Sequence, residues 1–178
     1  MYVAMLVYTG IFTIANLNNL VTMEDRKYEI LKDDFIIYKG KKLYRIKALK
    51  KFIAAGSSII NKGDLGGYVE GYHNLSQEGI CWVCRNSKVF GNARVKGDSI
   101  INNEAHVSDN AVICGKSWVS CASVFGNAVI SDSEVMGTGK SPSFIICGNV
   151  KVDRSIVVGN VFIFSGNEVF DNYVNVFP

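Results

Sequence analysis

The 178-residue sequence has only two histidines and two prolines, and no run of five or more like charges. Nineteen basic residues against sixteen acidic ones give a net charge of +3. This small, dispersed charge does not indicate a strong nucleic-acid or anionic-membrane surface. Two histidines cannot supply a three-histidine zinc site, and no nucleophile elbow, HExxH or Walker motif is present. The sequence therefore predicts no metal site and carries no recognised catalytic motif.

The five cysteines are odd in number and spread along the chain. This distribution favours free thiols in a reducing cytoplasm over a secreted disulfide framework. Cys81 and Cys84 have the CxxC spacing of metal and redox sites, but no second CxxC and no βαβ pattern accompanies them. In the repeat register given below, Cys81 faces inward and Cys84 outward. We therefore predict neither a metal nor a redox role for this pair.

Residues 1–22 carry no charge, and residues 1–15 are apolar enough to resemble a signal or membrane segment. A signal peptide normally begins with positive charge, which is missing here. Three asparagines between positions 16 and 19 also interrupt the stretch before it reaches the roughly 20 apolar residues of a membrane span. We interpret residues 1–22 as an extension upstream of a start at Met23. A membrane anchor, the only source of membrane contact we expect, is the alternative.

Residues 23–74 have the pattern of a small β module and a connector. Residues 35–49 place β-forming side chains on both sides of Lys39 and Gly40, which predicts a hairpin that turns at the glycine. Residues 61–68 are rich in glycine but lack the GxxxxGK[ST] order of a phosphate-binding loop. This segment is therefore expected to be a turn that precedes the repeats.

From residue 83 onward, an aliphatic residue returns every six positions. A one-residue slip near Trp118 and an insertion at residues 137–143 interrupt the period. The predicted inward residues are Val83, Val89, Val95, Ile101, Val107 and Ile113, then Val124, Ile130 and Met136, then Ile146, Val152, Val158, Phe164, Phe170 and Val176. Repetition at a fixed short period is typical of a solenoid.

Within each repeat, a small residue follows the aliphatic one by four positions, and Gly, Asn or Asp lies between them. These turn formers tolerate the positive φ of a sharp corner. Three repeats then close a triangular coil of about eighteen residues, and successive coils pair as parallel strands. The sequence predicts an all-β fold, with a parallel β-helix of about five coils over residues 75–178. Glu134 and Glu168 fall where small inward residues are expected.

Residues 74–83 and 89–98, which read NLSQEGICWV and VFGNARVKGD, resemble phage- and prophage-encoded hexapeptide-repeat proteins. Residues 43–49 and 62–70 of the preceding module share this resemblance, which covers about residues 23–135 well and the remainder more loosely. It implies a left-handed β-helix, against the usual crossover rule, in a protein of the bacterial or infected-cell cytoplasm. Members are often labelled transferases from the fold alone, which says little about function.

The same solenoid occurs in trimeric acyltransferases, which use a histidine base at a subunit cleft and a coenzyme A thioester. Here His106 occupies an outward position just before Val107, where a solvent-facing or interface histidine is the more ordinary interpretation. His73 lies in the connector and has no partner by spacing. An acyltransferase that uses His106 and acetyl-coenzyme A is therefore kept as the alternative to a protein with no cofactor.

One outward face is expected to carry a stripe of large apolar residues, one in each coil. Its members are Trp82, Ile100, Trp118, Val135 and Val157. A soluble chain rarely leaves such a stripe exposed. Either the N-terminal module folds back over it, or subunits associate through it as a homo-oligomer, which we expect to be a trimer; a foreign protein is the third possibility. The pattern slightly favours subunit association.

A second, smaller patch is expected on a neighbouring face, at Phe90, His106, Ser108 and Phe125. The insertion at residues 137–143 is a third place where recognition could occur, because insertions in repeat proteins form loops on one face. Together with the shortage of catalytic groups, these features indicate a non-enzymatic, phage-type binding or inhibitory protein. Its expected partner, beyond a second copy of itself, is a host protein.

Overall fold

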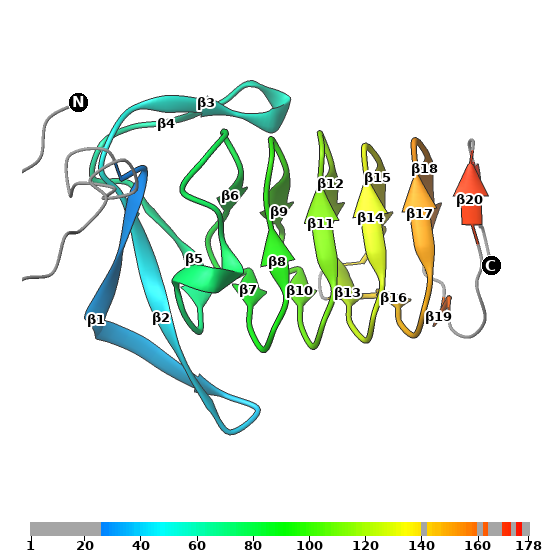
Figure 1. Cartoon of the computed structure of the whole chain (residues 1–178), viewed down its shortest axis with the longest axis horizontal. Helices are drawn as coiled ribbons and strands as arrows, with labels where there is room; N and C mark the ends of the chain where they lie inside the picture. The colour runs from blue at the N-terminus through cyan, green and yellow to red at the C-terminus, as the bar shows by residue number, and fades with distance from the viewer. Residues whose placement is uncertain (1–25, 140–141, 160–161, 164–168, 172–173, 176–178) are drawn as a thin grey trace, which may run out of the picture.

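Short parallel strands stacked in three sheets form most of the chain (Figure 1). The structure is a computed structural model that describes residues 26–139, 142–159, 162–163, 169–171 and 174–175. The first face holds β5 (Leu65–Val69), β7 (Lys88–Val89), β10 (His106–Val107), β13 (Ala122–Val124), β16 (Phe144–Ile146) and β19 (Phe162–Ile163). The second face holds β8 (Arg94–Val95), β11 (Val112–Cys114), β14 (Val129–Ser131), β17 (Lys151–Asp153) and β20 (Val169–Asp171). The third face holds β6 (Trp82–Val83), β9 (Ile100–Asn102), β12 (Trp118–Ser120), β15 (Glu134–Gly137), β18 (Ile156–Gly159) and β21 (Val174–Asn175).

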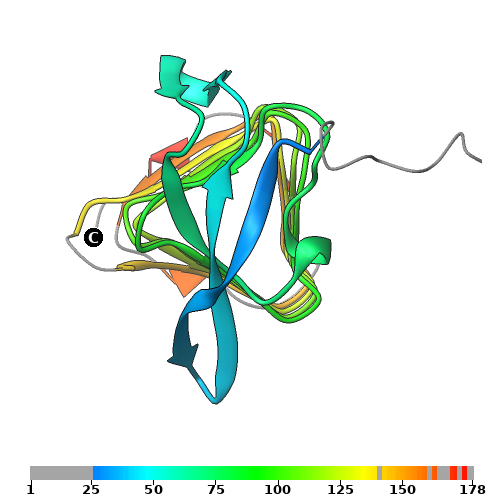
Figure 2. The same cartoon turned by 90° about the vertical axis from the view of Figure 1, so that its left-hand side faces the viewer.

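The three faces enclose a triangular prism of about five coils (Figure 2). Seen from the N-terminal end, the chain runs counter-clockwise as it moves away from the viewer, so the coils are left-handed (Figures 1 and 2). Within each face, successive strands pair in parallel from one coil to the next. This arrangement confirms the predicted parallel β-helix.

The core is a stack of inward aliphatic side chains with small residues beside them at the corners. Val89, Val107 and Ile113 are fully buried, as are Ala105 and Ala111. Burying a valine or isoleucine side chain contributes about 1.5–3 kcal/mol, so each coil adds several such terms while its backbone groups pair with the neighbouring coils. Apolar burial and strand pairing therefore grow together, one coil at a time.

Buried serines at one corner keep their hydroxyl groups hydrogen-bonded. The hydroxyl of Ser99 donates to the carbonyl of Lys96 at 2.9 Å, and that of Ser117 donates to the carbonyl of Cys114 at 2.6 Å. A buried hydroxyl without a partner would destabilise the fold. Ser99 and Ser117 are thus compatible with a dry core, whereas the buried hydroxyl of Ser87 has no hydrogen-bond partner among the described residues.

The predicted slip near Trp118 is confirmed, because five residues, not six, separate Val119 from Val124, and Val124 and Ile130 are buried as predicted. A second five-residue step, from Ile130 to Val135, was not predicted. Val119 pairs with Val135, which is fully buried, so the predicted inward position of Met136 is wrong by one residue. The predicted inward position of Val158 is also wrong by one residue, because Val157 is the fully buried valine of β18. The six-residue step that was predicted from Ile130 and from Val152 is therefore one residue too long.

A tighter corner explains each missing residue. Most sides use two residues to turn, whereas Cys121 and Asp132 each turn the chain alone, with φ of 50° and 46°. A single residue in the left-handed region shortens the side without moving the next strand off its face. Ser133, which is buried, then takes the small inward position, and Glu134 points outward instead.

The end of the solenoid is described only in part. Ile163 pairs with Ile146 and is nearly buried, so the inward residue of β19 comes one position before the predicted Phe164. Phe164, Glu168 and Val176 lie outside the described residues. Phe170 pairs with Val152 as predicted. The insertion leaves the third face after β15 and returns at β16, again as predicted.

A hairpin of β1 (Tyr28–Tyr38) and β2 (Lys41–Ala48) crosses the N-terminal end of the prism (Figure 2). It turns at Lys39 and Gly40, both with positive φ, which confirms the predicted hairpin. A second hairpin of β3 (Phe52–Ala54) and β4 (Ser58–Ile60), joined by the 3-10 turn η2 (Ala55–Ser57), runs along the third face. The turn η3 (Tyr72–Asn74) follows β5.

Strand β5 joins the module to the solenoid. It pairs antiparallel with β2 and parallel with β7, so both parts share one sheet. The turn predicted at residues 61–68 therefore covers only residues 61–64, and a strand follows it. Val69 and Leu75 are already buried inward residues, and Leu75 bridges to Val95. The predicted boundary between residues 74 and 75 thus falls inside the first coil.

The sequence pattern hides this first coil because eight residues, rather than six, separate Leu75 from Val83. Lys27 holds the longer segment in place from inside. Its Nζ donates to the carbonyl of Cys81 at 2.8 Å and lies 3.2 Å from the Cys81 sulfur, while the carbonyls of Glu78 and Gly79 are each 3.3 Å away. Burial lowers the pKa of Lys27 and raises that of Cys81. Cys81 faces inward, as predicted.

The described residues include no helix long and apolar enough to cross a membrane. Residues 1–22, interpreted from the sequence as an extension or an anchor, lie outside the described residues. Both interpretations of this segment remain predictions.

Gly67 gives a direct test of how the module and the solenoid meet. A Cβ built there would collide with the backbone oxygen of Ser87 and would lie 2.5 Å from that of Cys84. We expect Gly67→Ala to lower the free energy of unfolding by about 2–3 kcal/mol, since backbone atoms cannot yield easily. Gly40→Ala is the control. It meets no atom within 4 Å and should cost only about 1 kcal/mol for its positive φ. Urea denaturation measures both, and equal losses would contradict this account.

Candidate interaction surface

The column of outward residues on the third face differs from the predicted stripe. Backbone pairing aligns Trp82 with Ile100, Ile100 with Trp118, and Trp118 with Glu134. Glu134 then aligns with Ile156. Val135 and Val157, which were predicted to belong to the stripe, instead point inward and are fully buried. The shortened corner at Asp132 explains the error, because it shifts the following strand by one position and a one-residue shift reverses every side chain.

The β3–β4 hairpin covers the first part of this column. The Phe52 and Trp82 rings lie edge to face, with centroids 5.5 Å apart, and Trp82 and Ile100 are only 2% and 1% exposed. Of the two main ways to bury the stripe, the structure shows the one in which the N-terminal module folds back. The stripe is therefore not a free subunit interface, and a trimer remains a prediction without this support.

The cover ends at Trp118. Gly56, at the tip of the hairpin, has φ of +69°, and a Cβ there would lie 3.0 Å from the Trp118 ring. The indole Nε1 donates to Oδ1 of Asn102 at 3.0 Å, which fixes the ring on the face. Trp118 is half-buried. One side of its indole therefore supports the hairpin tip, while the rest borders the open part of the face.

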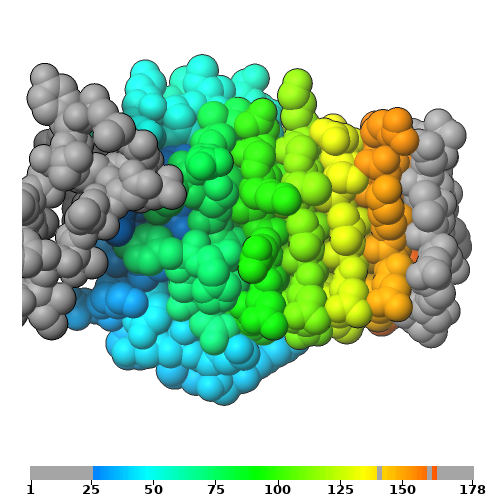
Figure 3. Space-filling view, viewed as in Figure 1, coloured from blue at the N-terminus to red at the C-terminus, as the bar shows by residue number. Residues whose placement is uncertain are grey.

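The outer side of the same hairpin is apolar and exposed. Ile53 and Ile59 are cross-strand neighbours and are 58% and 57% exposed. Figure 3 shows the β3–β4 segment as a ridge that stands above the neighbouring coils. Among the described strands, β3 and β4 pair only with each other, so the ridge has two unpaired edges. This surface was not predicted from the sequence, although on both strands an isoleucine lies next to a residue that faces inward.

The tip of the first hairpin covers part of the second predicted patch. Phe90 is only 5% exposed, and its ring centroid lies 5.6 Å from that of Tyr38. His106 and Phe125 are half-buried, and Ser108 is buried. The structure thus brings Phe90 and His106 together, but beneath the β1–β2 hairpin rather than on an open face.

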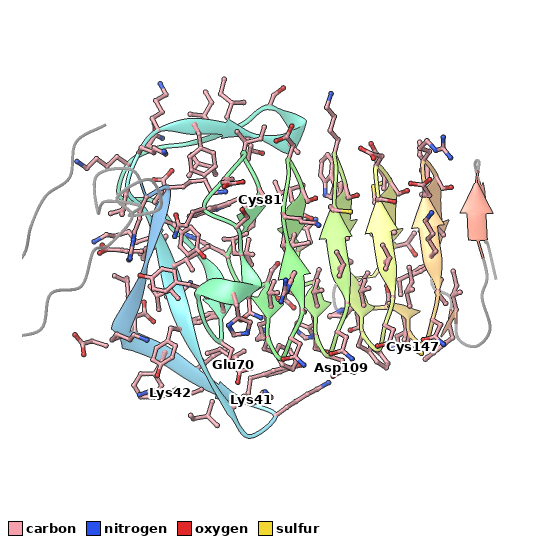
Figure 4. The ribbon with its side chains drawn as sticks, in the orientation of Figure 1. Lys41, Lys42, Glu70, Cys81, Asp109 and Cys147 are labelled. Carbon is pink, nitrogen blue, oxygen red and sulfur yellow. The ribbon has the colours of Figure 1, made fainter. Side chains whose placement is uncertain are left out.

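An ion pair anchors this hairpin to the first coils (Figure 4). Nζ of Lys41 lies 2.9 Å from the Glu70 carboxylate, which also accepts a hydrogen bond from the backbone N–H of Gly91 at 2.7 Å. Burial alone would raise the pKa of Glu70, but these two hydrogen bonds lower it overall. The pair lies at the surface, so its own contribution to stability is small.

His106 has a partner on each ring nitrogen. Its Nδ1 lies 3.1 Å from the Tyr38 hydroxyl, and its Nε2 lies 3.3 Å from Nζ of Lys88. Because an ammonium group can only donate, we assign the proton of the neutral ring to Nδ1. Burial, with Lys88 and Lys39 nearby, lowers the pKa of His106 to about 4. A histidine with this low basicity and an occupied Nε2 is poorly suited to act as a general base near neutral pH.

Among the grooves that border the third face in the described part of the chain, two extend along its open part. The larger, of about 520 Å³, follows one corner and is lined by Cys84, Arg85, Asn86, Asn102, Asn103, Glu104 and Cys121. The smaller, of about 300 Å³, lies at the hairpin tip and is lined by Ala55, Gly56, Ile80, Asp98, Lys116, Trp118 and Glu134. Neither groove includes a histidine, so His106 does not line the larger one.

The cysteines do not gather into a site. Cys81 lies in the first coils and Cys147 toward the other end of the prism (Figure 4). All five cysteines are free thiols, and burial raises the pKa of Cys84 to about 11. Such a thiol is poorly reactive at neutral pH. Within the described part of the chain, no three His, Cys, Asp or Glu side chains could hold a metal ion together.

Comparison with known proteins adds no family to this description. No protein-family model matches the sequence, and no curated protein matches it. The resemblance to phage-encoded hexapeptide-repeat proteins therefore remains a prediction from the motifs.

The low pKa of His106 predicts how stability depends on pH. The unfolded chain takes up a proton near pH 6.5 and the folded chain only near pH 4. The stability that the neutral ring contributes is therefore lost as the pH falls from about 6.5 to about 4. We expect an NMR titration to place the pKa of His106 near 4, and Lys88→Met to raise it because one positive charge is removed. Lys116→Met, on a different face, is the control. An unchanged pKa in Lys88→Met would contradict the assigned contact.

Proposed function

We propose that this chain is a non-enzymatic binding protein of the phage type. Its rigid β-helix presents the outer side of the β3–β4 hairpin first to a second copy and then to a host protein. The observation that carries the proposal is the exposed pair of Ile53 and Ile59 on a ridge with two unpaired strand edges. The unusual feature is that the hairpin is apolar on both sides.

The inner side explains why the hairpin can hold its shape. A two-stranded hairpin alone is marginally stable in water. Phe52 and Trp82 pack edge to face, and Ala54 and Ile60 are also buried, so the solenoid supports the hairpin from below. The outer isoleucines then occupy fixed positions before any partner arrives. A surface ordered in advance lowers the entropy cost of association.

The outer side offers two kinds of contact. Burying an isoleucine contributes about 1.5–3 kcal/mol, so two of them can supply a small hydrophobic centre for an interface. The free edges of β3 and β4 can also accept a strand from another chain, a common mode of protein recognition. Neither kind of contact needs a cofactor.

Self-association is the step to test first. We expect the wild-type chain to associate with rising concentration in sedimentation velocity, and the Ile53→Ser, Ile59→Ser double variant to remain a monomer. The substituted side chains face solvent, so the variant should unfold at the same urea concentration as the wild type. Ile37→Ser, which changes another exposed isoleucine on the β1–β2 hairpin, is the control and should associate like the wild type. A wild type that stays monomeric, or a double variant that still associates, would refute the proposed contact.

A coenzyme-A-dependent acyltransferase is the second candidate. It is supported by the groove of about 520 Å³ that follows one corner of the solenoid, a place where a subunit cleft could hold a long ligand. In that case His106 would have to release Lys88 and Tyr38 when subunits associate. Calorimetry with acetyl-coenzyme A separates the two functions. We expect no binding to the wild type, whereas binding together with acetyl transfer that His106→Ala abolishes would favour the enzyme.

A further inference from the structure

Glu134 is the one charged residue in an otherwise apolar column. Its neighbours along the column are Trp118 on one side and Ile156 on the other. Strand pairing places the glutamate one coil beyond the indole, just past the tip of the β3–β4 hairpin. Within the described part of the chain, its carboxylate makes no ion pair or hydrogen bond. A carboxylate beside an aromatic ring and without a partner is an arrangement that suits a cationic group.

The groove of about 300 Å³ surrounds this pair. Trp118 and Ile80 give it apolar walls, the hairpin tip at Gly56 closes one side, and the carboxylates of Asp98 and Glu134 lie on its lining. Lys116 also lines the groove and carries the only positive charge on it. Two carboxylates against one ammonium leave one negative charge in excess.

The shape and charge of the groove favour one kind of cation. A guanidinium is flat, so its face can stack on the indole while its N–H edge donates two hydrogen bonds to a carboxylate. An ammonium group is a compact, strongly hydrated charge, and it has no flat face that could stack on the indole while its edge binds the carboxylate. The hydrogen bond to Asn102 already holds the Trp118 ring in place. Stacking on this ring therefore costs little further side-chain entropy.

We propose that this groove binds the guanidinium of an arginine side chain that a partner protein presents, with Trp118 as the stacking surface and Glu134 as the paired carboxylate. This rests on the proposed binding function and names the chemistry of the partner at the edge of the hairpin ridge. Asp98 adds a second negative charge to the lining of the groove. The two isoleucines and the groove then flank the hairpin tip and could be contacted by one partner segment.

The two tryptophans allow a direct test on the full chain. Trp118 lies in the groove and Trp82 is buried under the hairpin, so their indole N–H signals in an NMR spectrum report the site and an internal reference. Trp118→Phe identifies which signal is which. The probe is N-acetyl-arginine amide, compared with N-acetyl-citrulline amide, which has the same shape without the charge, and with N-acetyl-lysine amide.

We expect the arginine probe to shift the Trp118 signal in a saturable way and leave Trp82 unmoved, while the other two probes bind about tenfold more weakly. Glu134→Gln should weaken arginine binding about tenfold, and Glu104→Gln, on a different corner, should not. No shift at Trp118, a citrulline or lysine probe that binds as tightly as the arginine probe, or full affinity in Glu134→Gln would overturn the proposal. The sedimentation test of Ile53 and Ile59 uses no arginine, so either result can fail without the other.

Discussion

The contact between β5 and the first coil is the constraint on which the rest of the structure depends. Gly66 and Gly67 let this strand approach the first coil closely. A Cβ at Gly66 would lie 2.7 Å from the backbone oxygen of Val83, and a Cβ at Gly67 would collide with the backbone oxygens of Ser87 and Cys84. Because β5 pairs on one side with β2 and on the other with β7, it continues the solenoid ladder directly into the N-terminal module. The end of the prism, which would otherwise expose unpaired strands, is thereby covered.

This junction also fixes where the two hairpins lie. The β1–β2 hairpin extends over the first face, where Tyr38 contacts Phe90 and His106, and the β3–β4 hairpin extends over the third face, where Phe52 contacts Trp82. Both apolar patches that the sequence indicates on the solenoid are therefore covered in part within one chain. The surface left for a partner is on the hairpins and at their tips. The proposed contacts therefore lie on the β3–β4 hairpin and beside its tip.

The repeat period predicted the inward residues correctly as far as Ile130, and again at Ile146 and Val152. Inward residues, corner positions, the N-terminal hairpin and the insertion follow from side-chain patterns that depend on local backbone geometry. The register of the strands that contain Val135 and Val157 does not, because a one-residue corner such as Asp132 looks like any other turn in the sequence. Glu134 shows the consequence, since it looks like a misplaced core residue in a six-residue period and is an outward groove residue in the real one.

The sequence alone determined that the chain is a parallel β-helix with a β-hairpin module before it, because the alternation of large and small inward residues leaves few other ways to bury them. Only the tertiary structure decided which apolar residues remain exposed. The stripe of Trp82 and Ile100 and the pair of Ile53 and Ile59 have the same apolar character in the sequence. One is buried and the other is not, because the hairpin has two sides and only one of them can face the solenoid.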